Sequence, residues 1–156
     1  MVINKCVEQG IYVILILSLE KDHKPMRSAT LSNILSVSDS YLKKILRKLV
    51  LADIIFSNPG KDGGFQLSRS IEDITLYDVY AALEGKECEI KTSDIGSRIF
   101  KSEKDFEKEE NIVENEFAKA NTAFLKELSK FALSNLVSKQ YYTKGTINFE
   151  SNKQTT

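Results

Sequence analysis

Hydrophobic and polar positions follow two different patterns within residues 38–67, the stretch around which the chain is organised. In its first part, apolar residues recur at i, i+3, i+4 and i+7, the spacing of one helix face. These residues are Leu42, Ile45, Leu46 and Leu49. The opposite face carries Ser40, Lys44 and Arg47, with Tyr41, Lys43 and Lys48 on its flanks. The pattern predicts a helix with one buried side and one basic side.

Residues 52–67 have the pattern of a β-hairpin. A β-rich run leads to Pro59 and three glycines, and Phe65-Gln66-Leu67 follows. Glycine adopts positive φ at no steric cost, so this loop can fold back tightly. The loop lacks the Gly-Lys-Ser/Thr ending of a phosphate-binding P-loop. A basic helix followed by such a hairpin is typical of a winged helix-turn-helix, in which the helix enters the major groove of DNA and the hairpin touches the backbone.

The segment before the basic helix supplies the other half of the helix-turn-helix. Residues 3–19 are apolar nearly all round, which predicts a well-buried first helix. Ser28 is a suitable N-cap for a short helix over Ala29–Leu35, residues 36–38 form the turn, and Ser38 or Asp39 caps the basic helix. Two short helices joined by a brief turn, the second of them basic, are the helix-turn-helix pattern.

Two further helices are predicted after the hairpin. Residues 72–85 form one, with Thr75 as N-cap, Asp78 completing a variant capping box and Gly85 ending it. Residues 111–138 form a long amphipathic helix whose apolar stripe is too broad to stay uncovered. We expect it to pack on the same helix of a second copy, with packing inside one chain as the alternative. The residues expected to hold this dimer are Phe117, Phe124, Leu128 and Phe131.

These elements predict a mainly α fold with a small β-hairpin wing, followed by a long C-terminal dimerisation helix. Residues 1–86 are expected to form the winged DNA-binding domain, residues 87–110 a polar linker or sensor-like segment with one short helix, and residues 111–138 the dimerisation helix. Residues 139–156 are a polar tail. Within it, Tyr141-Tyr142 and residues 146–149 have the composition of a short strand, and residues 151–156 that of a disordered end.

Charge confines any nucleic-acid site to a local patch. The chain has 22 basic and 22 acidic residues and a formal net charge of zero. Residues 41–69 nevertheless contain six basic residues and two acids, whereas acids dominate residues 103–116. The apolar run from Ile11 to Leu17 is too short to span a bilayer and lacks the features of a signal peptide. With two distant cysteines and no disulfide framework, we expect a cytoplasmic protein.

Catalytic and metal-binding chemistry has little support in the sequence. His23 has no second ligand nearby, and there is no nucleophile–base motif, so we predict neither an enzyme nor a cofactor. Cys88 is the candidate redox thiol. Its neighbours Glu87 and Glu89 should raise its pKa and lower its reactivity, although two nearby lysines offset this in part. An ordinary surface thiol is therefore the favoured interpretation.

Several short motifs together resemble those of the Rrf2 family of bacterial winged-helix regulators. They are Ser40-Tyr41-Leu42 with Ile45-Leu46 and Leu49, Gly63-Gly64-Phe65-x-Leu67, Ile74-x3-Asp78-Val79, and Ala82-x-Glu84-Gly85. The resemblance covers roughly the first half of the chain. It implies a dimeric repressor or activator. Some members carry an iron–sulfur cluster on three closely spaced cysteines after this helix; Cys88 stands alone there, so the cluster is not carried over.

The expected function is that of a sequence-specific transcriptional regulator, a repressor in the first instance, acting as a homodimer on palindromic double-stranded DNA. Its signal would be an unidentified small molecule or a redox change. The alternative is a dimeric winged-helix interaction module that has lost specific DNA binding. The expected DNA-binding residues are Ser38, Ser40, Tyr41, Lys43, Lys44, Arg47, Lys48 and Lys61.

Individual roles follow from side-chain chemistry and from the resemblance. Arg47 can make a bidentate contact to guanine, and the hydroxyls and amides at the start of the helix can hold phosphate. The chain departs from some relatives at two positions: Lys43 stands in place of a glutamate, and Pro59 in place of a wing arginine. Lys61 can replace the missing wing charge.

Overall fold

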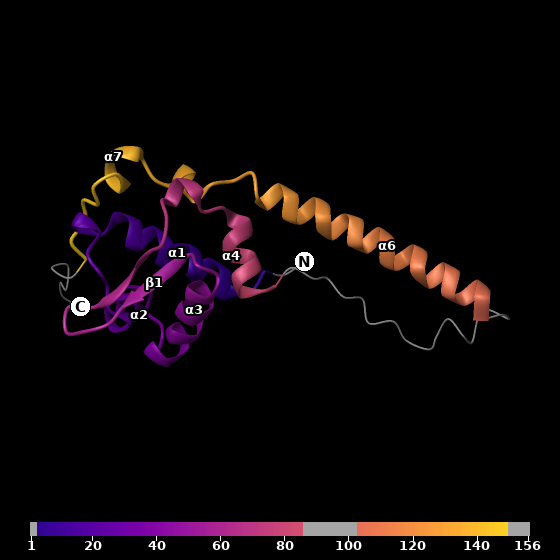
Figure 1. The fold of residues 1–156 in the computed structure, drawn as a ribbon, viewed down its shortest axis with the longest axis horizontal. Coiled ribbons are helices and arrows are strands. Elements are labelled where there is room, and N and C mark those ends of the chain that lie inside the picture. Colours follow the sequence, from indigo (N-terminus) through magenta and orange to yellow (C-terminus); the bar gives the residue numbers. More distant parts are fainter. Residues whose placement is uncertain (1–2, 86–102, 150–156) are drawn as a thin grey trace.

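The fold is mainly helical with a two-stranded antiparallel hairpin, as the sequence predicts (Figure 1). The computed structural model describes residues 3–85 and 103–149, and the side chains of residues 3–85 and 112–149. Its helices and strands are α1 (Lys5–Leu19), α2 (Ser28–Ile34), α3 (Asp39–Leu51), β1 (Ile55–Asn58), β2 (Gly64–Leu67), α4 (Leu76–Leu83), α6 (Glu103–Leu128) and α7 (Lys139–Tyr142). Short 3-10 turns occupy Lys21–His23, Ile71–Asp73 and Leu133–Leu136.

The core lies where α1, α3 and α4 pack together. The predicted apolar stripe of α3 is confirmed, since Leu42, Ile45, Leu46 and Leu49 are all buried. Val13 and Ile14 of α1 are fully buried beside it, as the first helix was expected to be. Full burial of one such side chain stabilises a fold by about 1.5–3 kcal/mol. Every helix in the described part of the chain is too short or too polar to cross a bilayer.

The wing is fixed near its loop to the connection between α1 and α2. β1 and β2 pair with Ile55 opposite Leu67. Beyond this ladder, Met26 donates its N–H to the carbonyl oxygen of Phe65 (3.0 Å) and accepts the Phe65 N–H (2.8 Å). A Cβ on Gly64 would lie 2.6 Å from the Met26 backbone, so glycine is required for this close approach. The start of β2, directly after the wing loop, is therefore held against the chain before α2.

The helix ends follow the predicted capping chemistry at three places out of four. Ser38 caps α3 by accepting the N–H of Tyr41. Thr75 and Asp78 form a reciprocal capping box at α4, and Gly85 follows that helix with φ of 97°. The prediction for Ser28 is wrong: Arg27 is the cap residue, and Ser28 is the first residue of α2. The helix expected over residues 72–85 begins instead with a 3-10 turn and becomes α-helical only at Leu76.

The helix predicted over residues 111–138 is wrong at both ends, because α6 runs from Glu103 to Leu128. Its first residues are strong helix formers rich in acids, which suit a helix N-terminus. It ends because the next residues pair with the chain before α4: the Leu76 N–H donates to the Phe131 carbonyl oxygen (3.0 Å), and the Leu133 N–H to that of Ile74 (2.8 Å). The rest of the expected linker, residues 87–102, lies outside the described residues.

The tail returns across α1. Ile147 pairs with Glu20 in a parallel bridge, accepting the Lys21 N–H (2.8 Å) and donating to the Leu19 carbonyl oxygen (2.9 Å). The strand-like character predicted for residues 146–149 is thus confirmed at Ile147, whereas Tyr141-Tyr142 belongs to α7 and that prediction is wrong. The end predicted to be disordered, residues 151–156, lies outside the described part of the chain.

Candidate nucleic-acid interface

The outer face of α3 is basic and exposed. Lys44 and Arg47 lie three residues apart on the side opposite the buried stripe. Within residues 3–85 and 112–149, neither side chain has a hydrogen bond or an ion pair. The other side of the helix is buried in the core, so both side chains project from a rigid element.

The start of α3 adds hydroxyl groups and a helix N-terminus. Ser38 and Ser40 are exposed with their oxygens 3.5 Å apart, and Tyr41 is 37% exposed. The amides at such a terminus attract anions. Lys43 lies in the same turn, but its ammonium is 2.6 Å from a carboxylate oxygen of Asp39. Lys43, with Ser28 second, holds the pKa of Asp39 below its usual value, so the charge of Lys43 is shared.

Lys48 is set apart from the other basic residues of α3. Its ammonium donates to the carbonyl oxygen of Leu83 at 2.6 Å, at the C-terminal end of α4. A cation is favourable there, since the last carbonyls of a helix lack partners and carry partial negative charge. The contact gives Lys48 a role in joining α3 to α4.

The wing tip lies beside the start of α2. Lys61 is exposed on the tip, and its carbonyl oxygen accepts a hydrogen bond from the Arg27 guanidinium at 2.5 Å. Arg27 was missed by sequence reasoning because it precedes α2 in an extended segment. The available signal was its position, since the first helix of a helix-turn-helix crosses the DNA backbone. The contact brings the wing tip and the helix pair into one surface.

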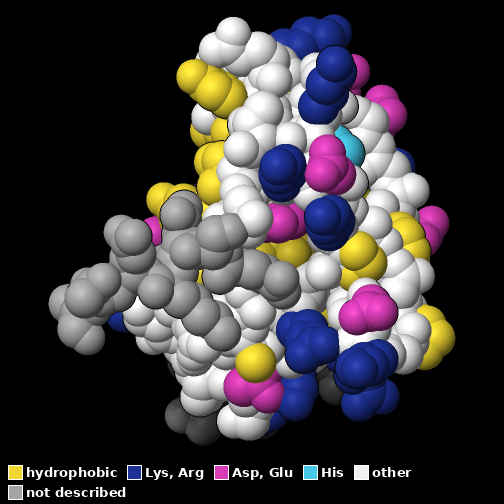
Figure 2. All heavy atoms as spheres, turned by 90° about the vertical axis from the view of Figure 1, so that its left-hand side faces the viewer, with side chains coloured by type: hydrophobic (Ala, Val, Ile, Leu, Met, Phe, Trp, Pro, Cys, Tyr) yellow, Lys and Arg dark blue, Asp and Glu magenta, His cyan; other side chains and the backbone are white. Residues whose placement is uncertain are grey.

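The side of the molecule that carries the wing is shown in Figure 2. The hairpin, α2 and α3 lie in the lower part of the fold in Figure 1, and Figure 2 shows Lys and Arg side chains both along the lower edge of this face and in its upper part. Acidic side chains are interspersed among them, in keeping with the zero net charge of the chain.

The residues predicted to hold a dimer have different surroundings. Phe117 is 52% exposed on the part of α6 that extends away from the rest of the chain in Figure 1. Phe124 is half-buried, with its ring 5.2 Å from that of Tyr80 in an edge-to-face contact. Leu128 and Phe131 are half-buried too, and Phe131 lies beyond the end of the helix.

An apolar groove runs along α1 and includes Leu128. It measures about 520 Å³ and lies between α1, α4 and the end of α6. Tyr12 (50% exposed) and Leu128 lie along it, and Leu136 adjoins them. On α6 itself, Ile112 and Val113 are about as exposed as Phe117. Together these side chains form an apolar surface that none of the described residues covers.

The comparison that decides the family covers most of the chain. The family model Rrf2, described as an iron-dependent transcriptional regulator, matches residues 3–139. This chain belongs to the Rrf2 family. The Rrf2 match extends past the motifs recognised in the first half and includes α6 and the turn after it.

Two curated relatives each match about half of the chain. YffB of Lactococcus lactis, named as a candidate HTH-type transcriptional regulator, is 48% identical over 79 residues, 51% of each chain. YwgB of Bacillus subtilis, named in the same way, is 48% identical over 80 residues, again 51% of each chain. The chain thus spans about half the length of the curated relatives it matches. These names describe regulators and no enzyme activity.

Solved structures of low identity share the Rrf2 fold. CymR, described as the global cysteine regulator of B. subtilis, has a TM-score of 0.61 at 18% identity and covers 87% of this chain and 95% of its own. IscR of T. potens has a TM-score of 0.62 at 16% identity, with coverage of 97% and 96%. At such identities the likeness concerns the fold alone.

The residues present do not fit the iron centre that the family description suggests. The chain has two cysteines. The thiol of Cys6 lies 3.3 Å from a carboxylate oxygen of Glu84, as a hydrogen-bond donor, and Cys88 lies outside the described residues. In the described part of the chain, no group of three or more His, Cys, Asp or Glu could hold a metal ion. A cluster held by three closely spaced cysteines therefore lacks its ligands.

Proposed function

We propose that this Rrf2 protein is a sequence-specific DNA-binding transcriptional regulator that acts as a homodimer on a palindromic site. The observation that carries the proposal is the outer face of α3, where Lys44 and Arg47 are exposed and have no partner within the described residues. A helix presented in this way fits the major groove of duplex DNA. We further propose that the protein acts as a repressor.

Each part of the surface is assigned a role. Arg47 reads a base edge, and Lys44 neutralises backbone phosphate. Ser38, Ser40 and Tyr41 bind phosphate at the start of α3, with Lys43 contributing the charge that it shares with Asp39. Lys61 and the added Arg27 bind the adjacent backbone from the wing side. Lys48 takes a smaller part, because its ammonium is engaged by Leu83.

The dimer is proposed to form through α6 and the groove along α1. Phe117 at 52% exposure, with its neighbours Ile112 and Val113, leaves an apolar surface that a second copy would cover. The half-buried residues of the predicted set are proposed to contribute to the same interface; they are Phe124, Leu128 and Phe131. Two copies related by a two-fold axis would present two α3 helices to half-sites about one DNA turn, or a multiple of it, apart.

The other expectations follow from this role. We infer that the protein is not an enzyme and works in the cytoplasm, where its DNA lies. Residues 1–86 are proposed to act as the DNA-binding part, and α6 (Glu103–Leu128), in place of the expected residues 111–138, as the dimerising part. An interaction module without DNA binding is the alternative, and Lys44 and Arg47, which are exposed and have no partner among the described residues, weigh against it.

Selection from a pool of random duplexes by the full chain tests the proposal. We expect a palindromic consensus to be enriched. On that consensus, Arg47→Ala should weaken binding by about 1–3 kcal/mol and relax preference at one position in each half-site. Lys119→Ala, which removes an exposed cation on α6, is the matched control and should bind as the wild type does. No enrichment over many rounds would contradict the proposal.

A further inference from the structure

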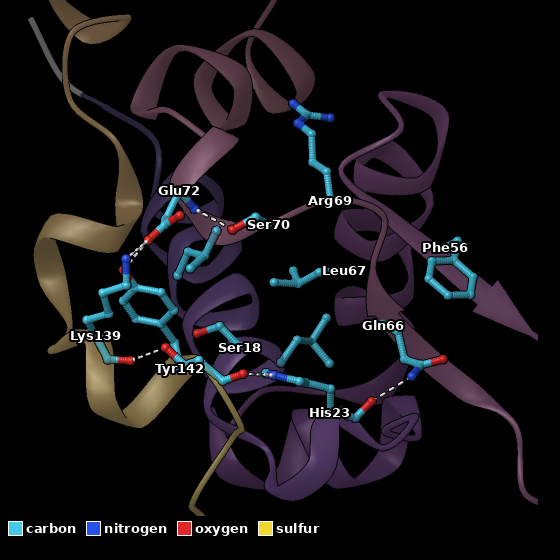
Figure 3. A pocket seen from close by; sticks show the side chains of 13 residues that line it. Ser18, His23, Phe56, Gln66, Leu67, Arg69, Ser70, Glu72, Lys139 and Tyr142 are labelled. Carbon is cyan, nitrogen blue, oxygen red and sulfur yellow. Dashed lines mark hydrogen bonds and ion pairs between the residues drawn. The ribbon is translucent and has the colours of Figure 1, made fainter.

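A cavity of about 500 Å³ lies between the wing base, the end of α1 and α7 (Figure 3). Its walls come from segments far apart in the sequence, so the tertiary fold shapes it. Leu17 and Ser18 belong to α1, Gln66 and Leu67 to β2, and Tyr142 to α7. In Figure 3, Leu67 projects towards the centre, and the ring of Tyr142 forms the opposite wall.

The inner wall combines apolar side chains with one buried hydroxyl. Leu17 is 3% exposed and Ile71 2%, and both line the cavity together with the half-buried Leu67. Ser18 also lines it and is 1% exposed. Its hydroxyl donates to the carbonyl oxygen of Leu15 at 2.8 Å, which leaves the Ser18 oxygen able to accept a hydrogen bond. The wall suits an apolar molecule with one donor group.

The charged groups at the rim are paired with one another. Glu72 accepts hydrogen bonds from the Tyr142 hydroxyl (2.7 Å) and forms an ion pair with Lys139 (3.3 Å). These contacts hold the pKa of Glu72 below its ordinary value, and Glu72 raises the pKa of Tyr142, so the carboxylate stays charged and the phenol protonated. Arg69 points away from the centre in Figure 3 and forms an ion pair with Asp78 (3.4 Å).

The pairing decides which ligand charge the cavity accepts. Glu72 and Lys139 form an ion pair within the lining, and Arg69 is paired with Asp78, which lies outside it. A ligand with a net charge would lose its hydration here without meeting an unpaired counter-charge, which is costly. An uncharged ligand avoids that cost, and its apolar part gains contact with Leu17, Leu67 and Ile71.

We propose that this cavity binds a small uncharged alcohol or phenol, with the apolar body between Leu67 and the Tyr142 ring and the hydroxyl donating to Ser18. The volume is within the range of small-molecule sites. Because the walls include β2 and α7, a bound molecule connects the wing base to the C-terminal tail. The site stands independently of DNA binding, since its test uses the protein alone.

The test is an NMR titration of the ¹⁵N-labelled full chain with three probes of similar size and different charge: 4-methylphenol, benzoate and benzylamine. We expect saturable shifts for 4-methylphenol, centred on Ser18, Leu67 and Tyr142, with a Kd on the order of 1 mM. Benzoate and benzylamine should bind at least about tenfold more weakly. Absence of saturation by 4-methylphenol, or equal or tighter binding of a charged probe, overturns the proposal.

Variants locate the site. Leu67→Phe fills the cavity and should weaken binding of 4-methylphenol by about tenfold. Leu51→Phe is the matched control, because the same substitution falls on a side chain that is 77% exposed at the end of α3. Thr143→Phe, at an exposed position of the rim, provides a second way to fill the cavity should Leu67→Phe disturb the wing. Unchanged binding in a folded filling variant overturns the assignment.

Discussion

Lys44 and Lys48 lie one helical turn apart on α3, yet their ammonium groups have different surroundings. Lys44 has no partner within the described residues, whereas Lys48 donates to the carbonyl oxygen of Leu83. Helical periodicity predicts that both are exposed, and both are. It cannot predict the contact of Lys48, because the accepting carbonyl belongs to α4 and is brought there by tertiary packing. The contact of Arg27 with the Lys61 carbonyl oxygen depends on tertiary packing in the same way.

Cys6 carries a prediction at this scale. Desolvation by burial, followed by the hydrogen bond to Glu84, raises the pKa of the Cys6 thiol, and Lys48 offsets this in part. A raised pKa means less thiolate at pH 8 and slower alkylation. In a Cys88→Ser background, Cys6 should react with iodoacetamide more slowly than a free cysteine peptide.

Glu84→Gln separates the two causes. This variant removes the carboxylate charge, so the Cys6 pKa should fall and alkylation at pH 8 should quicken, while the burial contribution keeps the rate below that of the peptide. The pH at which the rate reaches half its maximum, followed by mass spectrometry, gives the pKa directly. If wild-type Cys6 were alkylated as fast as the peptide, the raised pKa of its thiol would be contradicted.

At the scale of elements, helix interiors and most helix caps followed the sequence pattern, whereas the end of α6 depended on a distant partner segment. The α3 stripe and the Thr75–Asp78 capping box were predictable, because every residue involved lies within a few positions. The end of α6 was not. Its stop at Leu128 depends on the pairing of residues 131–133 with residues 74–76, which are 55 to 59 positions away in the chain.

A substitution at Leu133 tests whether the segment after α6 contributes to the core. This residue is fully buried, so Leu133→Ala should destabilise the fold by about 2–5 kcal/mol in urea unfolding. Leu136→Ala, the same change in the same turn on a side chain that is 48% exposed, should cost less than about 1 kcal/mol. Equal small losses for both variants would mean that the segment after α6 is only loosely attached.

At the scale of the whole molecule, the main feature is the length of α6 beyond the other helices (Figure 1). Its composition predicted a broad apolar stripe that needs a cover. It did not predict that the stripe is divided: the ring of Phe124 makes an edge-to-face contact with Tyr80 of α4, whereas Phe117 is exposed. Only the three-dimensional placement of α4 separates the part used within the chain from the part left for a second copy.

Phe117 is therefore the sharper test of the dimer. Phe117→Glu would place an unpaired charge in the proposed interface, and sedimentation should show a shift towards monomer with the helical content retained. Tyr141→Glu, on an exposed aromatic of α7, is the matched control and should leave the assembly unchanged. A dimer of wild-type strength in Phe117→Glu would place the interface elsewhere.

The central claim, that the outer face of α3 binds duplex DNA, is tested most directly by the salt dependence of binding to bulk duplex DNA. The wild type should bind with an affinity that falls steeply as salt rises. The double variant Lys44→Ala/Arg47→Ala should bind more weakly, with the slope of log K against log salt reduced by about 2 for each protomer bound. The double variant Lys119→Ala/Lys130→Ala, which removes two exposed lysines elsewhere, should keep the wild-type slope. Binding that is absent, or equal slopes for the two double variants, would contradict the account.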